Sequence, residues 1–243
     1  DQLPTAPADI TPAFFREAFA DTPEAFFLVG ALPWARNLTA KREVALRTVA
    51  ETLARPVFFV QPVSEDDGLL CGGESLIFQK GMLCARGKRF STDRLRMSLS
   101  AAALSCGETP SLTHNDPSEE LWQALVFGTR AFVKKTGAGS VLLGLSGGID
   151  SALVLAIAVD ALGEENVTAV LMPSRFNPES SVTDAEKLCS NLHVHSVILP
   201  IEPLHVCYQE TLEPLLADYP PNPHDVTFEN VQARIRGSLL CAL

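Results

Sequence analysis

The sequence lacks the features that would place it in a membrane, on nucleic acid or among disulfide-stabilised proteins. Its longest apolar run, residues 152–159, is far shorter than the roughly 20 residues that span a bilayer. Acidic residues outnumber basic ones by 29 to 19, so the chain has no basic surface for nucleic acid or anionic lipid. The six cysteines are widely spaced without a CxxC pair, and the N-terminus carries no secretory signal. We therefore expect reduced thiols and a cytoplasmic protein that binds neither nucleic acid nor membrane.

The hydrophobic pattern changes along the chain and divides it into two parts. The first part predicts a helix over residues 39–54, a strand over 57–60, and a hairpin of 75–78 and 82–85 around the turn at 79–81. A proline-containing polar stretch, 107–117, is typical of a linker. We expect three segments: 1–106, the linker 107–117, and 118–243.

The second part alternates helices and strands. A helix is expected from Ser118, which has the side chain of an N-cap, and another from a capping box at 181–184. Strands separated by helices at this spacing predict an α/β fold with a parallel sheet. The expected strands are 141–145, 167–172 and 194–199, and the other expected helices are 151–162, 203–218 and 228–243.

A loop rich in glycine and serine, residues 146–151, lies between the strand 141–145 and the helix that follows it. Gly147 and Gly148 allow a sharp turn and a close approach of the backbone to a ligand. The loop leads into a helix N-terminus, where free N–H groups and the helix dipole favour an anion. Asp150 would repel a phosphate unless a cation such as Mg²⁺ lay between them. No lysine follows the glycines, so the loop differs from the GxxxxGK[ST] phosphate loop.

The string Ser-Gly-Gly-Ile-Asp-Ser at 146–151 resembles the signature of the ATP-pyrophosphatase family. The resemblance implies a Rossmann-like parallel sheet of the adenine nucleotide alpha hydrolase-like type, cleavage of ATP between its α- and β-phosphates, and Mg²⁺ held partly by Asp150. It also implies that ATP binds to Gly144, Leu145, Ser146, Gly147, Gly148, Ile149, Asp150 and Ser151.

Further segments narrow the resemblance. Residues 119–243 are similar to the synthetase domain of the glutamine-dependent NAD⁺ synthetases, through LGLSGGIDSALVLAIAVDALG (143–163), ENVTAVLMPSR (165–175), SVTDAEKL (181–188), ILPIEP (198–203) and TFENVQARIRGSLL (227–240). The resemblance implies a ligase of NAD⁺ biosynthesis that converts deamido-NAD⁺ to NAD⁺ through an adenylate, releasing AMP and pyrophosphate. Ser174 and Arg175 would line the ATP pocket, and Asn230, Arg234 and Arg236 would bind deamido-NAD⁺. Asn230 and Arg234 are four apart and so share one helix face.

Residues 24–90 look like the later part of the nitrilase-like α/β sandwich, a glutaminase, that precedes the synthetase in this family. The resemblance rests on the segments ALPW (31–34), the helix 40–53, PVFFVQPVSEDD (56–67) and GGES (72–75). The family usually has serine in place of Leu32 and asparagine in place of Gln61. Its catalytic Glu, Lys and Cys would lie upstream of residue 1, so we expect no glutaminase catalytic residue here. We expect a fragment of a longer homo-oligomeric enzyme that uses glutamine or ammonia.

Several residues and functions stay open from the sequence alone. Cys71 and Cys84 are interpreted as small buried hydrophobes, and His205 is placed in a surface segment without a role. His193 and His195 have the spacing of a metal pair on a strand, although simple alternation explains them equally well. The alternative functions are another ATP-pyrophosphatase amidotransferase and a catalytically incomplete nucleotide-binding module.

Overall fold

The structure, a computed structural model, describes residues 11–13, 24–97, 116–217 and 226–243. The chain divides into two compact units, Asp1–Ala131 and Phe132–Leu243, and each is described by itself. The predicted linker at 107–117 lies outside the described residues except for its last two. Among the described helices, none has the length and apolar character that crossing a membrane requires.

The first unit contains a four-stranded mixed sheet in the order β1 (Phe26–Val29), β2 (Val57–Val60), β5 (Leu76–Gln79) and β6 (Met82–Arg86). β1 and β2 are parallel and the other pairs are antiparallel. β5 and β6 form the predicted hairpin. A separate hairpin pairs β3 (Val63–Asp66) with β4 (Leu69–Gly72).

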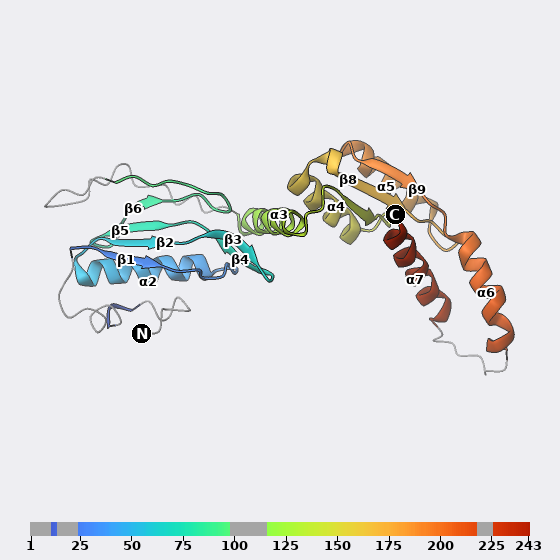
Figure 1. The fold of residues 1–243 in the computed structure, drawn as a ribbon, viewed down its shortest axis with the longest axis horizontal. Coiled ribbons are helices and arrows are strands. Elements are labelled where there is room, and N and C mark those ends of the chain that lie inside the picture. The colour runs from blue at the N-terminus through green and yellow to red at the C-terminus, as the bar shows by residue number, and fades with distance from the viewer. Residues whose placement is uncertain (1–10, 14–23, 98–115, 218–225) are drawn as a thin grey trace. The chain divides into compact units, whose positions relative to one another are not determined.

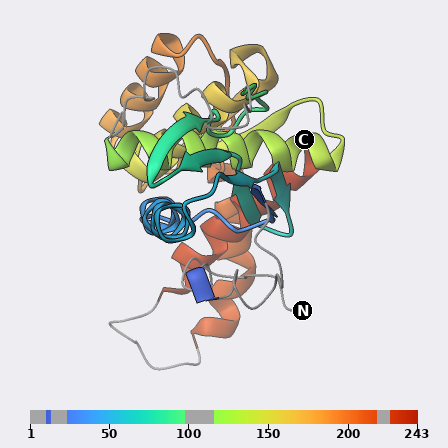
Figure 2. The same cartoon turned by 90° about the vertical axis from the view of Figure 1, so that its left-hand side faces the viewer.

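Helix α2 (Leu38–Leu53) lies along one face of the four-stranded sheet, as Figure 1 shows from the side and Figure 2 shows nearly end-on. Its residues Leu46 and Val49 are fully buried. They pack in one cluster with the inward side chains of alternate strand positions, among them Val57 and Phe59. Alternation along the strands therefore places one set of apolar side chains under the helix.

The second unit is built on a parallel sheet in the order β7 (Val141–Gly144), β8 (Val167–Leu171) and β9 (His195–Ile198). The helices are α4 (Ile149–Leu162), α5 (Glu179–Asn191), α6 (Glu202–Leu216) and α7 (Thr227–Ala242), with a short 3₁₀ helix η2 (Glu164–Asn166) (Figure 1). Helix α3 (Pro117–Thr136) precedes β7, and its last turn belongs to this unit. The predicted α/β architecture with a parallel sheet is confirmed.

Both faces of the central strand β8 are covered. Ala169 and Leu171 pack with residues of α4 and α5, whereas Val170 packs with Ile235 of α7. Because neighbouring strand residues point to opposite faces, α4 and α5 cover one side of the sheet and α7 the other. The carboxyl ends of β7 and β8 are thereby left beside α7.

Three helices begin differently from the prediction. In α3 the cap is Asp116, whose Oδ1 accepts a hydrogen bond from the backbone N of Ser118 at 2.9 Å, so Ser118 is not the cap. Helix α4 begins at Ile149, two residues before the predicted start. Helix α5 begins at Glu179 after Pro178, and no side chain caps it. The expected capping box at 181–184 therefore lies inside the helix.

The cysteines depart in part from the expectation of reduced thiols. Cys71 and Cys189 are free and buried, and Cys207 and Cys241 are free and exposed. Cys84 is buried as expected, but it is disulfide-bonded. The wide spacing of the cysteines along the sequence therefore did not exclude a disulfide.

Candidate functional site

The loop between β7 and α4 has a shape that only glycine permits at position 147. Gly147 has a φ of +80°, and a Cβ added there would lie 2.2 Å from the carbonyl oxygen of Ser181. The first turn of α5 thus lies directly against the loop. Gly148 has an extended backbone, with φ of −87°, and forms the N-cap of α4. The predicted turn from strand into helix is present, and the backbone N–H groups of the first turn of α4 lie at its end.

The two serines of the loop hold it together by hydrogen bonds. The hydroxyls of Ser146 and Ser151 lie 2.9 Å apart, and the Ser151 hydroxyl accepts from the backbone N of Ser146 at 3.2 Å. The same hydroxyl donates to the carbonyl oxygen of Gly148 at 3.0 Å. All these groups are at least partly exposed, so the loop is pre-organised and accessible to a ligand.

A cavity of about 430 Å³ opens at the carboxyl ends of β7 and β8. Four of the predicted site residues line it: Gly144, Leu145 and Ser146 from β7 and the segment that follows it, and Arg236 from α7. The remaining walls are mostly apolar, and they are formed by Leu171, Met172, Pro173, Asn177, Ser181, Val182, Ala233, Gly237 and Leu240. The cavity therefore joins the first residue of the glycine–serine loop to an apolar pocket, in the place where open α/β sheets bind ligands. Gly147, Gly148, Ile149, Asp150 and Ser151 do not line it.

Arg236 is fixed at the wall of this cavity. Its Nε donates to the carbonyl oxygen of Met172 at 3.1 Å, and its Nη2 donates to Oδ1 of Asn177 at 3.1 Å. Burial lowers the pKa of the guanidinium from its ordinary value. An arginine keeps its charge under such a shift, so Arg236 brings a partly desolvated positive charge to the cavity.

Two polar residues of this region, Asn177 and Gln232, were not predicted from the sequence. Asn177 Oδ1 accepts from the backbone N and the hydroxyl of Ser174, at 2.9 Å and 3.0 Å. The Ser174 hydroxyl also lies 2.9 Å from Oε1 of Gln232, which is buried in α7. Asn177 follows a strand end, and Gln232 precedes Arg236 by four residues. These two positions in the sequence could have indicated that both residues lie near the site.

Arg175 and Ser174 do not line the cavity. Glu202, at the start of α6, accepts from the backbone N of Arg175 at 3.1 Å and pairs with its guanidinium. Hydrogen bonding from the Arg175 side chain, and then from its backbone, lowers the pKa of Glu202. The guanidinium also lies over the ring of Phe176, 5.8 Å from its centroid. Arg175 is therefore paired with Glu202 of α6. Ser174 contacts Asn177, which lines the cavity, but does not line it itself.

Asn230 and Arg234 lie on one face of α7, as their spacing predicts. Both are exposed, and Nη1 of Arg234 donates to the carbonyl oxygen of Asn230 at 3.3 Å. Neither lines the cavity that contains Arg236. The three polar residues predicted to bind one substrate are thus divided between the cavity and an open helix face.

Asp150 lies in the first turn of α4 with an exposed carboxylate. No hydrogen bond or ion pair occupies this carboxylate within the part of the chain that the structure describes. Among those same residues, no three His, Cys, Asp or Glu side chains gather to hold a metal. His193 and His195 do not form a pair on one strand, because His193 precedes β9 in a turn with φ of +56°.

His205 is not a surface residue, contrary to the expectation. Its side chain is 1% exposed, and its ring lies edge-on between Phe176 and Phe228, with centroids 5.6 Å and 5.9 Å away. Within the part of the chain that the structure describes, neither ring nitrogen has a hydrogen-bond partner. The position is buried because α6, α7 and the segment after β8 converge there.

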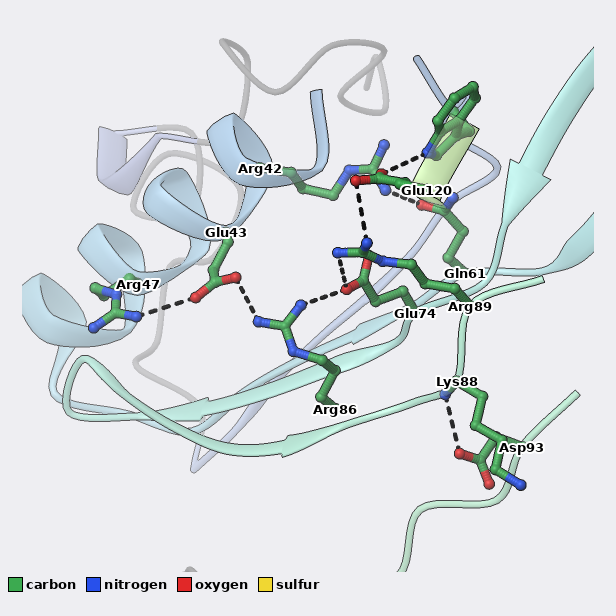
Figure 3. A network of polar contacts seen from close by, with 11 residues as sticks. Arg42, Glu43, Arg47, Gln61, Glu74, Arg86, Lys88, Arg89, Asp93 and Glu120 are labelled. Carbon is green, nitrogen blue, oxygen red and sulfur yellow. Dashed lines mark hydrogen bonds and ion pairs between the residues drawn. The ribbon is translucent and has the colours of Figure 1, made fainter. Parts of the chain in front are cut away.

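In the first unit, the two departures from the glutaminase pattern are structural residues. Leu32 belongs to the apolar core under α2. Gln61 is buried and uses both ends of its amide. Its Nε2 donates to the carbonyl oxygen of Leu32 at 2.9 Å. Its Oε1 accepts from Nη1 of Arg42 at 2.7 Å (Figure 3).

A chain of ion pairs continues from α2 across the first unit (Figure 3). Arg86 bridges Glu43 and Glu74, and Arg89 joins Glu74 at 2.9 Å to Glu120 at 3.2 Å. These carboxylates are occupied by guanidinium groups, and Cys71 is buried nearby. The ion pairs therefore connect the elements of this unit. Among its described residues, no nucleophile lies beside a base.

Comparison with known proteins identifies the second unit most clearly. Residues 121–243 match the protein family described as NAD synthase. A glutamine-dependent NAD(+) synthetase of Thermotoga maritima is 48% identical over 125 residues, 51% of this chain and 21% of that protein. A glutamine-dependent NAD(+) synthetase of Synechocystis sp. is 38% identical over 218 residues, which are 88% of this chain and 38% of the relative.

A solved structure extends the likeness to the fold. The glutamine-dependent NAD+ synthetase of Acinetobacter baumannii, in complex with adenosine diphosphate, superposes with a TM-score of 0.84 and 32% identity. The match covers 90% of this chain and 41% of that one. The matches to the Synechocystis and Acinetobacter proteins therefore span about two-fifths of the length of those relatives and most of this chain.

Proposed function

The chain belongs to the NAD synthase family, and on that premise we propose that it takes part in the ATP-dependent amidation of deamido-NAD⁺ to NAD⁺. The observation that carries the proposal is the cavity lined by both Ser146 of the loop and Arg236 of α7. Its size suits a nucleotide, and its walls offer apolar surface for a base and positive charge for phosphates.

The proposed reaction has two steps. A carboxylate oxygen of the nicotinate group attacks the α-phosphorus of ATP, and the bond to the bridging oxygen breaks, which releases pyrophosphate. Ammonia then attacks the acyl carbon of the adenylate, loses a proton, and AMP leaves. The protein's contribution is to hold two anionic substrates in line and to stabilise the charge on the phosphates.

Asp150 fits the requirements of a magnesium ligand. Its carboxylate is exposed at the phosphate loop and is the only acidic group of that loop. Mg²⁺ is usually bound by one or two carboxylates together with substrate phosphates and water, so a single free carboxylate is a suitable donor. When bound, Mg²⁺ would neutralise phosphate charge. Asp150 would hold it there.

The dinucleotide would use the open face of α7. Asn230 and Arg234 present an amide and a guanidinium on one exposed face, where they are accessible to a large polar ligand. Arg236 faces the cavity and is better placed to contact ATP than deamido-NAD⁺. This division of roles revises the expectation that Asn230, Arg234 and Arg236 all contact the same substrate.

The first unit would be the later part of a glutaminase that supplies ammonia. The names of the relatives, glutamine-dependent NAD(+) synthetases, support glutamine as the nitrogen source. The catalytic residues of glutamine hydrolysis are not expected among those described here. The predicted homo-oligomer and cytoplasmic location belong to the same proposal.

Isothermal titration calorimetry with ATP and Mg²⁺ tests the nucleotide site directly. We expect saturable binding by the chain, and a loss of about tenfold in affinity for Asp150→Ala when Mg²⁺ is present but not when it is removed with EDTA. Asp160→Ala, at the exposed far end of the same helix, is the matched control. Equal affinity of the Asp150 variant and wild type in Mg²⁺ would contradict the metal assignment.

Exchange of labelled pyrophosphate into ATP identifies the acid that becomes adenylated. We expect exchange that depends on deamido-NAD⁺. Exchange supported instead by a purine nucleotide or a tRNA would identify another ATP-pyrophosphatase amidotransferase. ATP binding without exchange for any acid would favour a nucleotide-binding module.

A further inference from the structure

Gln232 is a buried polar residue that stands behind the wall of the nucleotide cavity. Its side chain is 8% exposed on α7 and does not line the cavity. Oε1 of Gln232 lies 2.9 Å from the hydroxyl of Ser174 and 3.5 Å from Nη2 of Arg236. Burying an amide is unfavourable unless it is hydrogen-bonded, so these contacts explain why glutamine is tolerated there.

The hydrogen bonds around Asn177 require a second acceptor. Its Oδ1 is reached by three donors: the backbone N of Ser174, the Ser174 hydroxyl and Nη2 of Arg236. A carbonyl oxygen offers two lone pairs. Oε1 of Gln232 is within reach of two of the same donors, so it can relieve Asn177 of one of them.

This arrangement fixes two polar side chains that line the cavity, those of Asn177 and Arg236. Asn177 is held with its oxygen turned toward Ser174 and Arg236, and within the described residues its NH₂ group has no hydrogen-bond partner. Arg236 is held between Met172, Asn177 and Gln232. Both residues are cavity-lining, and both depend on an acceptor that does not itself touch the cavity.

We infer that Gln232 is a positioning residue for nucleotide binding, which acts through the Ser174–Asn177 turn and through Arg236. This inference rests on the proposed function, because it takes the ligand of the cavity to be ATP. Gln232 orients the Asn177 amide and the Arg236 guanidinium before the nucleotide arrives. Pre-organised donors bind more tightly because less ordering is needed on binding.

Two substitutions of Gln232 test the role. Gln232→Met keeps the length of the side chain and removes the acceptor, so the dissociation constant for ATP should rise about tenfold. Gln232→Glu keeps acceptor oxygens beside Arg236 and Ser174, so its ATP affinity should stay within about threefold of wild type. Hydrogen bonds to a charged partner have about the strength that a tenfold change requires.

Ile235→Val is the matched control for stability. Ile235 is the other buried residue of α7, and it packs against Val170, Met172 and Ile201 without a polar contact. The control should lower the free energy of unfolding and leave the ATP affinity unchanged. Calorimetry with ATP and urea unfolding on the same four proteins separate positioning from stability.

The outcomes are distinct. Wild-type binding of ATP with equal affinity in Gln232→Met would overturn the positioning role and leave the proposed function standing. A loss of affinity in Ile235→Val as large as that in Gln232→Met would also overturn it, because destabilisation alone would then explain the effect. Failure of the wild-type chain to bind ATP would overturn both the inference and the ATP site on which it rests.

Discussion

Replacing Gly147 with alanine should destabilise the second unit and abolish ATP binding. The backbone φ of +80° is in the left-handed region, which costs an alanine about 1–2 kcal/mol. The new Cβ would also lie 2.2 Å from the Ser181 carbonyl oxygen, so the loop or the first turn of α5 must move. Such overpacking typically costs about 1–3 kcal/mol. We expect a total loss of about 3 kcal/mol in the free energy of unfolding.

Gly148→Ala is the internal control for this prediction. Gly148 has an ordinary φ of −87°, and among the described residues the only neighbour of an added Cβ within 4 Å is the hydroxyl oxygen of Ser146 at 3.4 Å. We expect a loss below about 1 kcal/mol, because an alanine fits this conformation without a clash.

Urea unfolding followed by far-ultraviolet circular dichroism measures both variants, and calorimetry measures their ATP affinity. The reasoning would be refuted if the Gly147 and Gly148 variants lost equal stability. It would also be refuted if Gly147→Ala bound ATP like wild type, since the loop would then tolerate a side chain against α5.

Three further predictions concern buried and paired groups. His205→Phe should leave the free energy of unfolding unchanged or raise it, because it removes two buried nitrogens that have no partner among the described residues. A loss above about 2 kcal/mol in urea unfolding would contradict this. Glu74→Gln should lower the free energy of unfolding of the first unit by about 3 kcal/mol in the same assay, because Arg86 then loses one of its two carboxylate partners in a largely buried network. A loss below about 0.5 kcal/mol would mean that the network contributes no more than a surface ion pair. The contribution of Glu202 to stability depends on pH: Arg175 lowers its pKa below the ordinary 4.5, so the contribution is present above about pH 4.5 and disappears as the pH falls through the lower folded-state value. Unfolding of wild type and Glu202→Gln at a series of pH values should therefore converge in acid, and a difference that persisted there would exclude the ion pair as its source.

The sequence by itself determined the features that local chemistry controls. The strand–loop–helix around Gly147 follows from small residues between an apolar strand and an apolar helix. The parallel sheet follows from strands that alternate with helices. The pairing of Asn230 and Arg234 on one face of α7 follows from helical periodicity alone.

Tertiary structure decided which of these residues face the cavity and which polar groups support it. Arg236 lines the cavity and Arg234 does not, because α7 packs on the sheet through a row of apolar side chains that includes Val231, Leu239 and Leu240, and this packing as a whole sets which side of the helix faces the cavity. His205 is buried because helices distant in sequence meet over it. Gln232 and Asn177 acquire their roles through contacts 58 and 59 residues apart along the chain, to Ser174 and Arg236 respectively. No local pattern encodes such contacts, since they depend on how whole helices dock.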